Sequence, residues 1–396
     1  MCKLARGLTC SSPRPHQVIG FWSSGRKSQL VMEASKSGAT PEASHARSIV
    51  FVGPDRSPYF VTESTRLPIT LAKGQVLVLI EAATICGSDL HTLSGRRTIP
   101  HPCVLGHEGC GVVVASEREE VNVGERVTWG MCTSCNNCLP CSLGLQNKCS
   151  SLHKVGHTVV STAPLFGTYS THILCLPGTP VVPLPPALTP RLAAPINCAL
   201  ATMVNALSKL PPTPSPGQPG ASVALVQGAG MLGMYAVALL KEAGYKKVFC
   251  VDVKWSRLGS VTKFGATPVH ADQEEELIES NSVDAVFEVS GNKQVLPQGM
   301  RALRNGGTYV LVGLVHPDSH MDITAQAIIL KCLTVVGVHN YTAQHLKEAV
   351  SFLNRHHESY PFDTLLGPSY PLSDFRNAVE VARSGQFFRV VINPQQ

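Results

Sequence analysis

The chain has 396 residues, 44% apolar and 15% charged, a composition that excludes a disordered protein and leaves room for two domains. The formal net charge is +6, but residues 1–47 carry seven Lys or Arg against two Glu, so the remainder has a net charge of only +1. A nucleic-acid surface is therefore not expected on the folded part. Because no apolar run reaches about 18 residues, a membrane span is not expected either.

Residues 1–47 are Ser-rich and contain Arg, with no acidic residue before Glu33. This composition suits a mitochondrial transit peptide, but a disordered extension, or translation starting at Met32, is the favoured interpretation. We therefore expect a cytoplasmic protein, with the mitochondrial matrix as the second choice. The start of the chain lacks the apolar segment of a secretory signal, so the 14 cysteines are expected to stay reduced and the clustered ones to bind metal.

From Ser48 onward, short runs rich in β-branched residues alternate with Gly, Pro and Asn. They predict an all-β or barrel-like half, and the runs are SIVFV, QVLVLIEAAT, GCGVVVASE and ERVTWG.

After Pro190 the pattern changes to continuous apolar strands separated by helical segments. ASVALVQ is followed by MLGMYAVALLKEAG, which has helical periodicity and ends in Gly, and the later strands are KVFCVDV, VDAVFEVSG, GTYVLVGL and LTVVGV. Buried strands separated by helices predict a parallel sheet with crossover connections. The segment Pro211–Gly220 is too rich in Pro for anything but a loop.

The segment SCNNCLPCSLGLQNKC, residues 134–149, holds four cysteines separated by two, two and seven residues. A gap of two lets neighbouring sulfurs bind one ion at Zn–S distances of about 2.3 Å. Four thiolates would close a tetrahedral shell, making the site structural and ordering a loop with little apolar content. The expected ligands are Cys135, Cys138, Cys141 and Cys149. Cys132 permits a shifted set, and unbound or redox-active cysteines are the alternative interpretation.

A second, open metal site is predicted from residues that lie farther apart. A catalytic zinc takes three protein ligands and keeps its fourth position for water or substrate. The segments ATICGSDLHTLSG, LGHEGCG and AAPINCALAT offer a Cys–His–Cys combination for it, namely Cys86, His107 and Cys198. A single buried Cys or His is more often structural, so the prediction depends on the combination.

Three polar residues beside these ligands complete the predicted site. Asp89 is expected to accept a hydrogen bond from the far nitrogen of His107 and so to fix its tautomer. Ser88 is expected to bind the substrate hydroxyl and to pass its proton outward to His91.

The segment VALVQGAGMLG predicts a dinucleotide site, because its glycines follow a strand and open a helix. Gly228 permits the tight turn, Gly230 lets the backbone approach the pyrophosphate, and Gly233 allows close helix–strand packing. The phosphates would lie at a helix N-terminus. Asp252, at the end of the next strand, favours NAD over NADP, although Lys254 and Arg257 lie close by in the sequence. A Rossmann-like domain without a ligand is the alternative.

Over Ser48 to Pro394 the chain resembles the zinc-dependent medium-chain alcohol dehydrogenases. CGSDLH, GHE, the spaced cysteines, GAGMLG and the acidic strand end occur in the order found in that family. The resemblance implies an α/β fold in which a GroES-like β-barrel catalytic domain, residues 48–199, precedes a doubly wound Rossmann cofactor domain, residues 200–339. Residues 1–47 would be an extension, and residues 340–396 would return to the catalytic domain.

The resemblance also implies roles for individual residues. Cys86, His107 and Cys198 match the catalytic zinc ligands, and Ser88 and His91 match the proton relay. Glu108 matches an acidic neighbour that can approach the metal, Thr202 a residue near the nicotinamide, and Arg389, in GQFFRVVI, a basic residue that reaches the pyrophosphate. Gly87 departs from relatives that have an Arg there, which shifts phosphate binding to Arg389 and the helix N-terminus.

The expected activity is hydride transfer between an alcohol or polyol and NAD, with two zinc ions per chain. The alternatives are a zinc-independent, NADPH-using reductase of the same fold, which the ligand set and Asp252 oppose, and a non-catalytic zinc- and nucleotide-binding relative. RVTWG, KVGH, NCALAT and GVHNY are most similar to a branch named for a proposed role in phosphonate catabolism, which does not fix the substrate. Trp129, His157 and Tyr341 are candidate pocket residues, and a homodimer or homotetramer is implied by the resemblance.

Overall fold

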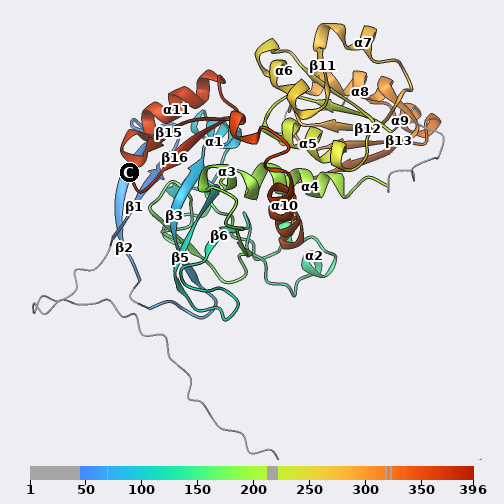
Figure 1. Cartoon of the computed structure of the whole chain (residues 1–396). Helices are drawn as coiled ribbons and strands as arrows, with labels where there is room; N and C mark the ends of the chain where they lie inside the picture. Colours follow the sequence, from blue (N-terminus) through green and yellow to red (C-terminus); the bar gives the residue numbers. More distant parts are fainter. Residues whose placement is uncertain (1–44, 69, 212–221, 317–318, 322) are drawn as a thin grey trace, which may run out of the picture. The chain divides into compact units, whose positions relative to one another are not determined.

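The computed structural model describes residues 45–68, 70–211, 222–316, 319–321 and 323–396, and Figure 1 shows its elements in chain order. The expected N-terminal extension lies outside the described residues, apart from His45–Arg47, which belong to the first strand. That strand, β1, thus begins three residues before the expected Ser48. Of the expected Pro-rich loop, only Pro211 is described.

Two sheets make up the first half of the described chain and take in the C-terminus as well. The smaller is antiparallel, with the order β2 (Phe60–Arg66), β1 (His45–Phe51) and β4 (Cys103–Val104). The larger has the order β15 (Leu366–Pro371), β16 (Arg389–Asn393), β3 (Val76–Thr84), β5 (Glu108–Ser116), β6 (Arg126–Trp129) and β8 (Val181–Pro183), with β7 (His172–Cys175) also paired with β3. An isolated bridge, Ser48–Ser170, links β1 to the segment before β7.

The C-terminal strand has a direct consequence for the predicted site. In β16, Val391 pairs with Thr84 and Ile392 with Ala83 on β3. Because β3 leads into Cys86, this pairing brings a segment some 300 residues away in the sequence beside the first predicted zinc ligand. Helix α11 (Phe375–Ser384) covers this end of the sheet, with Phe375, Ala378 and Val379 buried against it (Figure 1).

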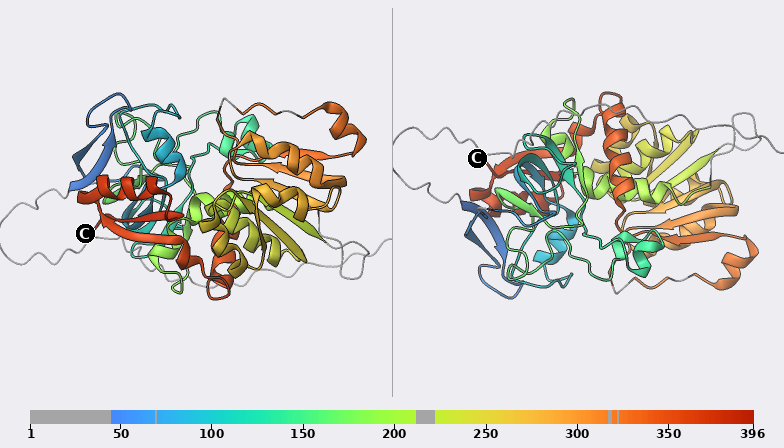
Figure 2. Two further views of the ribbon diagram at one scale, coloured as in Figure 1. Left: turned by 90° about the horizontal axis from the view of Figure 1, so that it is seen from above. Right: turned by 90° about the horizontal axis from the view of Figure 1, so that it is seen from below.

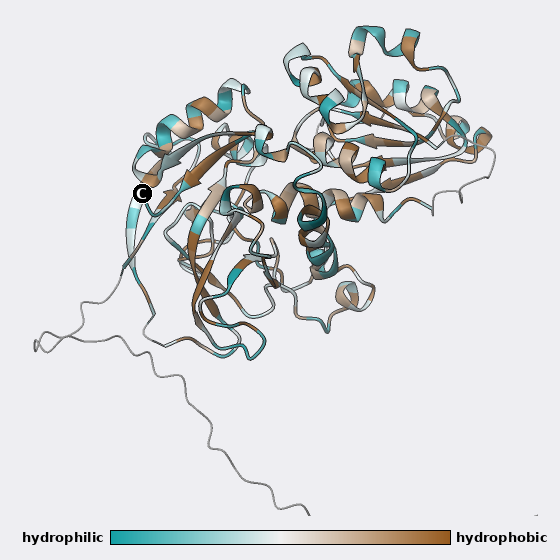
Figure 3. Cartoon of the chain, viewed as in Figure 1, coloured by the Kyte–Doolittle hydropathy of each residue, from teal (hydrophilic) through white to brown (hydrophobic). Residues whose placement is uncertain are grey.

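The second half contains a six-stranded sheet in which every pair is parallel. The order is β11 (Thr267–His270), β10 (Lys247–Asp252), β9 (Val223–Gln227), β12 (Val283–Glu288), β13 (Leu303–Leu311) and β14 (Thr334–Gly337). This 3-2-1-4-5-6 order is that of the doubly wound dinucleotide-binding fold, and it places a crevice where β9 and β12 end. The central strands are apolar, as expected for strands covered on both faces (Figure 3).

Helices flank the parallel sheet and connect its strands (Figure 2). They are α5 (Met231–Glu242), α6 (Trp255–Val261), α7 (Glu274–Leu277), α8 (Leu296–Ala302) and α9 (Ala325–Leu330). The remaining helices are α1 (Gly87–Leu93), α2 (Leu139–Ser142), α3 (Pro190–Ala193), α4 (Ala201–Leu207) and α10 (Ala343–His356). Among the described residues, none of the helices combines the length and the apolar character that crossing a membrane requires.

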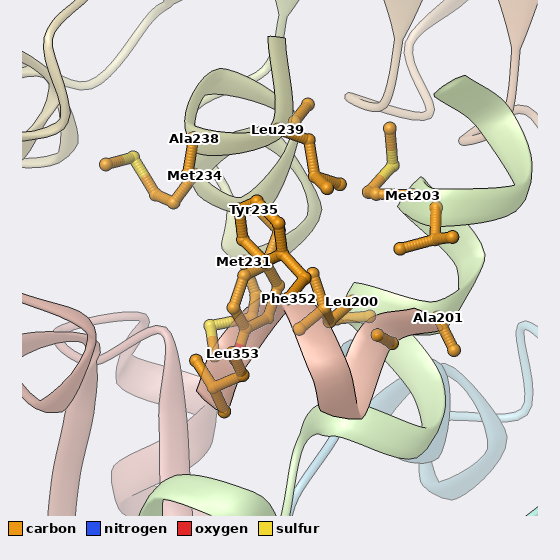
Figure 4. Packing of buried hydrophobic residues seen from close by; sticks show 14 of the residues in the cluster. Leu200, Ala201, Met203, Met231, Met234, Tyr235, Ala238, Leu239, Phe352 and Leu353 are labelled. Atoms are coloured by element: carbon orange, nitrogen blue, oxygen red, sulfur yellow. The ribbon is translucent and has the colours of Figure 1, made fainter. Parts of the chain in front are cut away.

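One buried cluster joins the helix that opens the cofactor crevice to the helix that follows Cys198. Met231, Tyr235 and Leu239 of α5 pack with Leu200 and Met203 around α4, and Phe352 and Leu353 of α10 complete the cluster (Figure 4). Burying a Leu, Met or Phe side chain fully stabilises the fold by about 1.5–3 kcal/mol. The glycine-rich turn and the turn that carries Cys198 are therefore held against each other by a packed core.

Glu274, a buried acid at the start of α7, makes the stability of the protein depend on pH. Burial raises the pKa of Glu274 to about 7 against the opposing effects of Gln227 and Arg301. Between the ordinary pKa of 4.5 and this value the folded chain holds a proton that the unfolded chain loses, so stability falls as pH rises. We expect Glu274→Gln to raise the free energy of unfolding at pH 8 by about 3 kcal/mol, and by little below pH 4.5.

Denaturant unfolding at both pH values measures this effect. The matched control is Glu276→Gln, the same change at an exposed position of the same helix, because the charge of Glu275 itself raises the pKa of Glu274. Equal stabilisation of the two variants, or a gain for Glu274→Gln that does not depend on pH, would contradict the prediction.

Candidate functional site

Four cysteine sulfurs lie within 4.8 Å of one another in the segment between β6 and β7. The pairs Cys138–Cys141 and Cys149–Cys135 are 3.5 Å apart, and Cys138–Cys149 are 3.9 Å apart. Sulfurs at the corners of a zinc tetrahedron are about 3.8 Å apart, given Zn–S bonds of about 2.3 Å, so the group has the spacing of a closed zinc site. Cys132 lies outside it and instead accepts a 3.8 Å contact from Asn340 Nδ2.

Backbone N–H groups orient these sulfurs. Ser150 N donates to Cys138 Sγ at 3.4 Å, and Cys135 N donates to Cys149 Sγ at 3.3 Å. The first of these hydrogen bonds is the main reason that the pKa of Cys138 falls to about 6, whereas burial raises the pKa of Cys141 to about 12. Backbone hydrogen bonding, first from Asn137, also lowers the pKa of Cys135, so two of the sulfurs favour the thiolate form that binds metal, and metal binding would displace the proton of Cys141.

A second group of ligand atoms, also within 4.8 Å of one another, comes from three distant segments. Its members are Cys86, His107, Glu108 and Cys198. Cys86 caps the N-terminus of α1, His107 and Glu108 lie where β5 begins, and Cys198 lies in a π-helical turn, Ile196–Leu200. A hydrogen bond between the two sulfurs lowers the pKa of Cys86 and raises that of Cys198, so the pair shares a proton in the absence of metal.

Asp89 holds His107 from the side away from this group. Asp89 Oδ1 is 3.2 Å from His107 Nδ1, although the angle falls short of a well-aligned hydrogen bond. Its other oxygen, Oδ2, accepts from Tyr169 Oη at 2.7 Å and from Cys86 N at 3.0 Å. Burial opposes protonation of His107, but Asp89 and Cys86 overcome it and raise the pKa of His107 to about 10. The Nε2 atom is thereby directed toward the two sulfurs.

Arg389 lies against this group of ligand residues, and its guanidinium pairs with the buried carboxylate of Glu108. Arg389 Nε and Nη2 donate to the two oxygens of Glu108 at 2.7 and 2.8 Å, and Nη2 also contacts Cys86 Sγ at 3.4 Å. Thr84 Oγ1 donates to Glu108 at 2.6 Å. Burial raises the pKa of Glu108 to about 7 against the effect of Arg389. The arginine predicted to reach the pyrophosphate thus binds Glu108 here, and its pyrophosphate role stays a prediction.

Asn197 holds the turn that carries Cys198, and sequence reasoning missed it. Its Oδ1 accepts from Gly109 N at 3.1 Å, while Nδ2 donates to the carbonyl oxygens of His107 at 3.1 Å and Trp129 at 2.9 Å. These bonds fasten the turn to the start of β5. The only signal in the sequence is the position of Asn197 directly before Cys198.

The other predicted residues lie around the group as follows. Ser88 Oγ is 3.4 Å from His107 Nε2, and His91 is exposed one turn later in α1. Thr202 is buried in α4, one turn after Cys198. Of the candidate pocket residues, Trp129 is fully buried in a core of its own half, whereas the ring of His157 lies 5.8 Å from the ring of His107.

The glycine-rich turn between β9 and α5 has the expected backbone. Gly228 has a φ of 115°, and a Cβ there would lie 2.9 Å from Ser290. A Cβ on Gly233 would lie 1.9 Å from the Gly228 carbonyl oxygen, so the helix packs too closely for any side chain. Beside Gly230, in contrast, nothing lies within 4 Å of that position. The open space at the N-terminus of α5 is therefore available to a ligand, and a phosphate suits it chemically.

Two carboxylates shape the crevice around this turn. Asp252 Oδ2 accepts from Ala229 N at 2.8 Å and Oδ1 from Lys254 N at 2.9 Å, and Arg257 is 3.8 Å away. Glu288, which sequence reasoning missed, ends β12 and accepts backbone N–H bonds from Gly291 at 2.6 Å and from Gly313 and Leu314. These bonds fix the loops at the strand ends, where a dinucleotide binds in this fold.

Comparisons with known proteins agree with both halves. A model described as an alcohol dehydrogenase GroES-like domain matches residues 72–186, and one described as a zinc-binding dehydrogenase matches residues 232–355. The L-threonine 3-dehydrogenase of Bacillus subtilis is 28% identical over 349 residues, covering 83% of this chain and 94% of its own length.

Solved structures show the same fold. An alcohol dehydrogenase from Thermotoga maritima has a TM-score of 0.78 at 24% identity, covering 88% of this chain and 99% of its own. A dehydrogenase of Sinorhizobium meliloti described as zinc-binding, solved with NADP, has a TM-score of 0.76 at 23% identity, covering 89% and 100%. With the two family models, which together match more than half of its residues, the chain belongs to the zinc-dependent medium-chain alcohol dehydrogenases. It is an oxidoreductase with a GroES-like and a Rossmann-type part.

Proposed function

We propose that the protein is a zinc-dependent alcohol dehydrogenase that transfers hydride between an alcohol and NAD. The observation that supports this most directly is the convergence of Cys86, His107 and Cys198, from three distant segments, with their ligand atoms within 4.8 Å. Two sulfurs and one imidazole form the donor set of open catalytic zinc sites. A zinc ion bound there would supply a Lewis acid for the alcohol oxygen, and a bound nicotinamide would accept the hydride.

The residues around the ligands have separate tasks in this proposal. Asp89 fixes the orientation of His107, and Arg389 neutralises Glu108 so that this carboxylate stays beside the ligands without closing the site. Ser88 Oγ, 3.4 Å from His107 Nε2, is placed to accept the proton of the alcohol. His91 lies on the same face of α1 at the exposed surface and releases that proton to water.

The test is a coupled assay of the zinc-loaded full chain against primary, secondary and polyhydric alcohols with NAD and with NADP. Alcohol-dependent formation of the reduced cofactor, lost on chelation and restored by zinc, supports the proposal. A chain that binds zinc and reduced cofactor but oxidises none of the alcohols with either cofactor would be the non-catalytic relative.

Asp252 is expected to determine the preference for NAD. Each of its oxygens already accepts one backbone N–H and keeps a lone pair for a ribose hydroxyl, while its charge would repel a 2′-phosphate. Asp252→Asn removes the charge and loses one of the two backbone N–H bonds, because its amide nitrogen cannot accept, and it leaves Lys254 and Arg257 beside the site. We expect the NADP-to-NAD ratio of kcat/KM to rise about 10- to 100-fold. Steady-state kinetics with both cofactors measure it, and an unchanged ratio would show that Asp252 only holds the turn.

A further inference from the structure

The turn that carries Cys198 has backbone hydrogen bonds that differ from those of an α-helix. In an α-helix the Ala201 N–H would donate to the carbonyl oxygen four residues earlier, which is that of Asn197. Here it is directed to the carbonyl oxygens of Ile196 and Cys198 instead, because the turn Ile196–Leu200 is π-helical. Such turns are rare and occur mostly at functional sites. The Asn197 carbonyl oxygen is thus left without the partner that an α-helix would give it.

Tyr341 supplies a partner for this oxygen from a distant part of the chain. Its Oη donates to the Asn197 carbonyl oxygen and accepts from the backbone N of Met131 at 3.2 Å. The direction of both bonds is fixed, because a backbone N–H can only donate and a carbonyl oxygen can only accept. Asn197 is fully buried and Tyr341 is 6% exposed, so a protein hydroxyl rather than bulk water satisfies this oxygen.

The segment that carries Tyr341 is itself held in place. It leaves the parallel sheet at the end of β14, where Val338 N donates to the Leu311 carbonyl oxygen at 2.9 Å. Asn340 then takes a left-handed conformation, with a φ of 58°, and its carbonyl oxygen accepts from Asn205 Nδ2 of α4 at 2.7 Å. The hydroxyl that contacts the ligand turn is therefore positioned by the cofactor-type sheet and by α4.

The register of the turn decides where the Cys198 sulfur points. Returning the turn to α-helical bonding would shift it by one residue, which is about 100° about the helix axis. Leu200 and Met203 are fixed in the buried cluster of Figure 4, so the rotation would fall on the Cys198 side. The sulfur would then turn away from Cys86 and His107, whose ligand atoms now lie within 4.8 Å of it.

We propose that Tyr341 is a positioning residue for the candidate metal site. Its hydroxyl keeps the Asn197 carbonyl oxygen out of α-helical bonding, and the π-helical turn thereby aims Cys198 at the other two ligands. The side chain of Asn197 fixes where the turn lies, through its bonds to the start of β5 and the end of β6, whereas Tyr341 fixes the register of the turn. This inference rests on the proposed function and adds to its site a residue that follows the parallel sheet.

Tyr341→Phe tests the proposal, because it removes the hydroxyl and keeps the ring in the core. The affinity of each zinc ion is measured on the full chain by titration with a chelator at low temperature. We expect the variant to keep one ion as firmly as the unmodified chain and to hold the other about 10- to 100-fold more weakly, the range found for outer partners of zinc ligands. Alcohol turnover should fall through kcat, with KM for NAD little changed, because the glycine-rich turn is untouched.

Tyr245→Phe is the matched control, since Tyr245 is a buried tyrosine of the same cluster but lies in the connection from α5 to β10. We expect it to hold both ions with unchanged affinity. A lower Tm of Tyr341→Phe with both affinities unchanged would overturn the proposal and leave Tyr341 a core residue only. Equal weakening of both ions would overturn it as well, because a positioning role concerns the open site alone.

Cobalt gives a readout of ligand geometry that does not depend on turnover. Cobalt(II) bound by thiolates absorbs visible light, and its bands change with the arrangement of the ligands. Cys198→Ser, which is expected to keep only the ion of the closed site, identifies the bands of that site. We expect Tyr341→Phe to change the remaining bands and to leave those of the closed site as they are. A spectrum identical to that of the unmodified chain would overturn the proposal.

Asn205→Ala is a second variant that leaves the hydroxyl and every ligand in place. It frees the backbone of Asn340 and so loosens the segment that carries Tyr341. We expect the open-site ion to be held about 3- to 10-fold more weakly, less than in Tyr341→Phe because the hydroxyl is still present. If Tyr341→Phe does not fold, unchanged affinity of this ion in Asn205→Ala would overturn the proposal.

Metal binding also separates this inference from the proposed function. If the unmodified chain binds only the ion of the closed site, both are overturned together. If it binds two ions and Tyr341→Phe holds them equally firmly with the same cobalt spectrum, only the positioning role is overturned. If the open-site ion is weakened in Tyr341→Phe but the unmodified chain oxidises no alcohol with either cofactor, the positioning role is supported and the proposed function is overturned.

Discussion

Replacing Cys198 with serine is expected to remove one of two bound zinc ions and to lower turnover more than about 100-fold, while the chain stays folded. An open catalytic site has three protein ligands, so the loss of one leaves too few to hold the metal. Even outer partners of zinc ligands change activity or affinity by about 10- to 100-fold, and a direct ligand should cost more. The turn Ile196–Leu200 keeps its anchor, because Asn197 is untouched.

Zinc content by mass spectrometry, turnover and thermal unfolding are measured on the same preparation. Cys332→Ser is the matched control, since this cysteine is exposed and belongs to neither sulfur cluster. We expect the control to keep both zinc ions and full turnover. Retained turnover in Cys198→Ser would rule out the ligand set, and a large fall in Tm would show that Cys198 is mainly structural.

The structure brings together the residues of both predicted ligand sets, and the closed set could be predicted from the sequence because metal sites impose rigid spacing. Cys135, Cys138 and Cys141 are separated by gaps that only a local turn can bring onto one ion, and the fourth cysteine follows within reach. The glycine-rich turn could be predicted in the same way, since a Cβ at Gly228 or Gly233 would collide with backbone atoms. In these places the chemistry restricts the residue type at each position, so the pattern is visible without a structure.

The contacts between distant segments could not be predicted in this way. Arg389 meets Glu108 across 281 positions because β16 pairs with β3, and nothing in GQFFRVVI shows that pairing. This contact depends on which strands become neighbours, and strand neighbours far apart in the chain leave no local pattern.

The fold class followed from the same logic at a larger scale. Continuous apolar strands separated by helices required a parallel sheet covered on both faces, and the observed order confirms the doubly wound prediction. The first half was less determined, because its strands divide into two sheets with a C-terminal contribution. The start of β1 at His45 was missed because two of its first three residues, His45 and Arg47, are basic and exposed and so resemble the preceding tail.

Replacing Cys138 with serine should have the opposite outcome from Cys198→Ser, a stability loss with the catalytic group intact. The leucines around α2 face solvent, with Leu139 71%, Leu143 65% and Leu145 47% exposed, while Cys141 and Cys149 are buried. The buried side chains of this segment, residues 132–154, therefore include cysteines in place of the leucines that would form an apolar core. Bound metal must then supply the free energy that folds the segment. We expect the loss of one zinc ion and more than about 3 kcal/mol, or a fall in Tm of roughly 6–12 °C.

In limited proteolysis of Cys138→Ser, we expect new cleavage sites within residues 132–154, because the rest of the chain has its own buried clusters. Turnover measured at low temperature, before this segment unfolds, should remain within a few-fold of the unmodified chain, since Cys138 is outside the Cys86–His107–Cys198 group. Cys332→Ser again serves as the control. If Cys138→Ser keeps both zinc ions and its Tm, the four sulfurs do not hold a structural metal. The short distances between them would then reflect only the packing of reduced thiols.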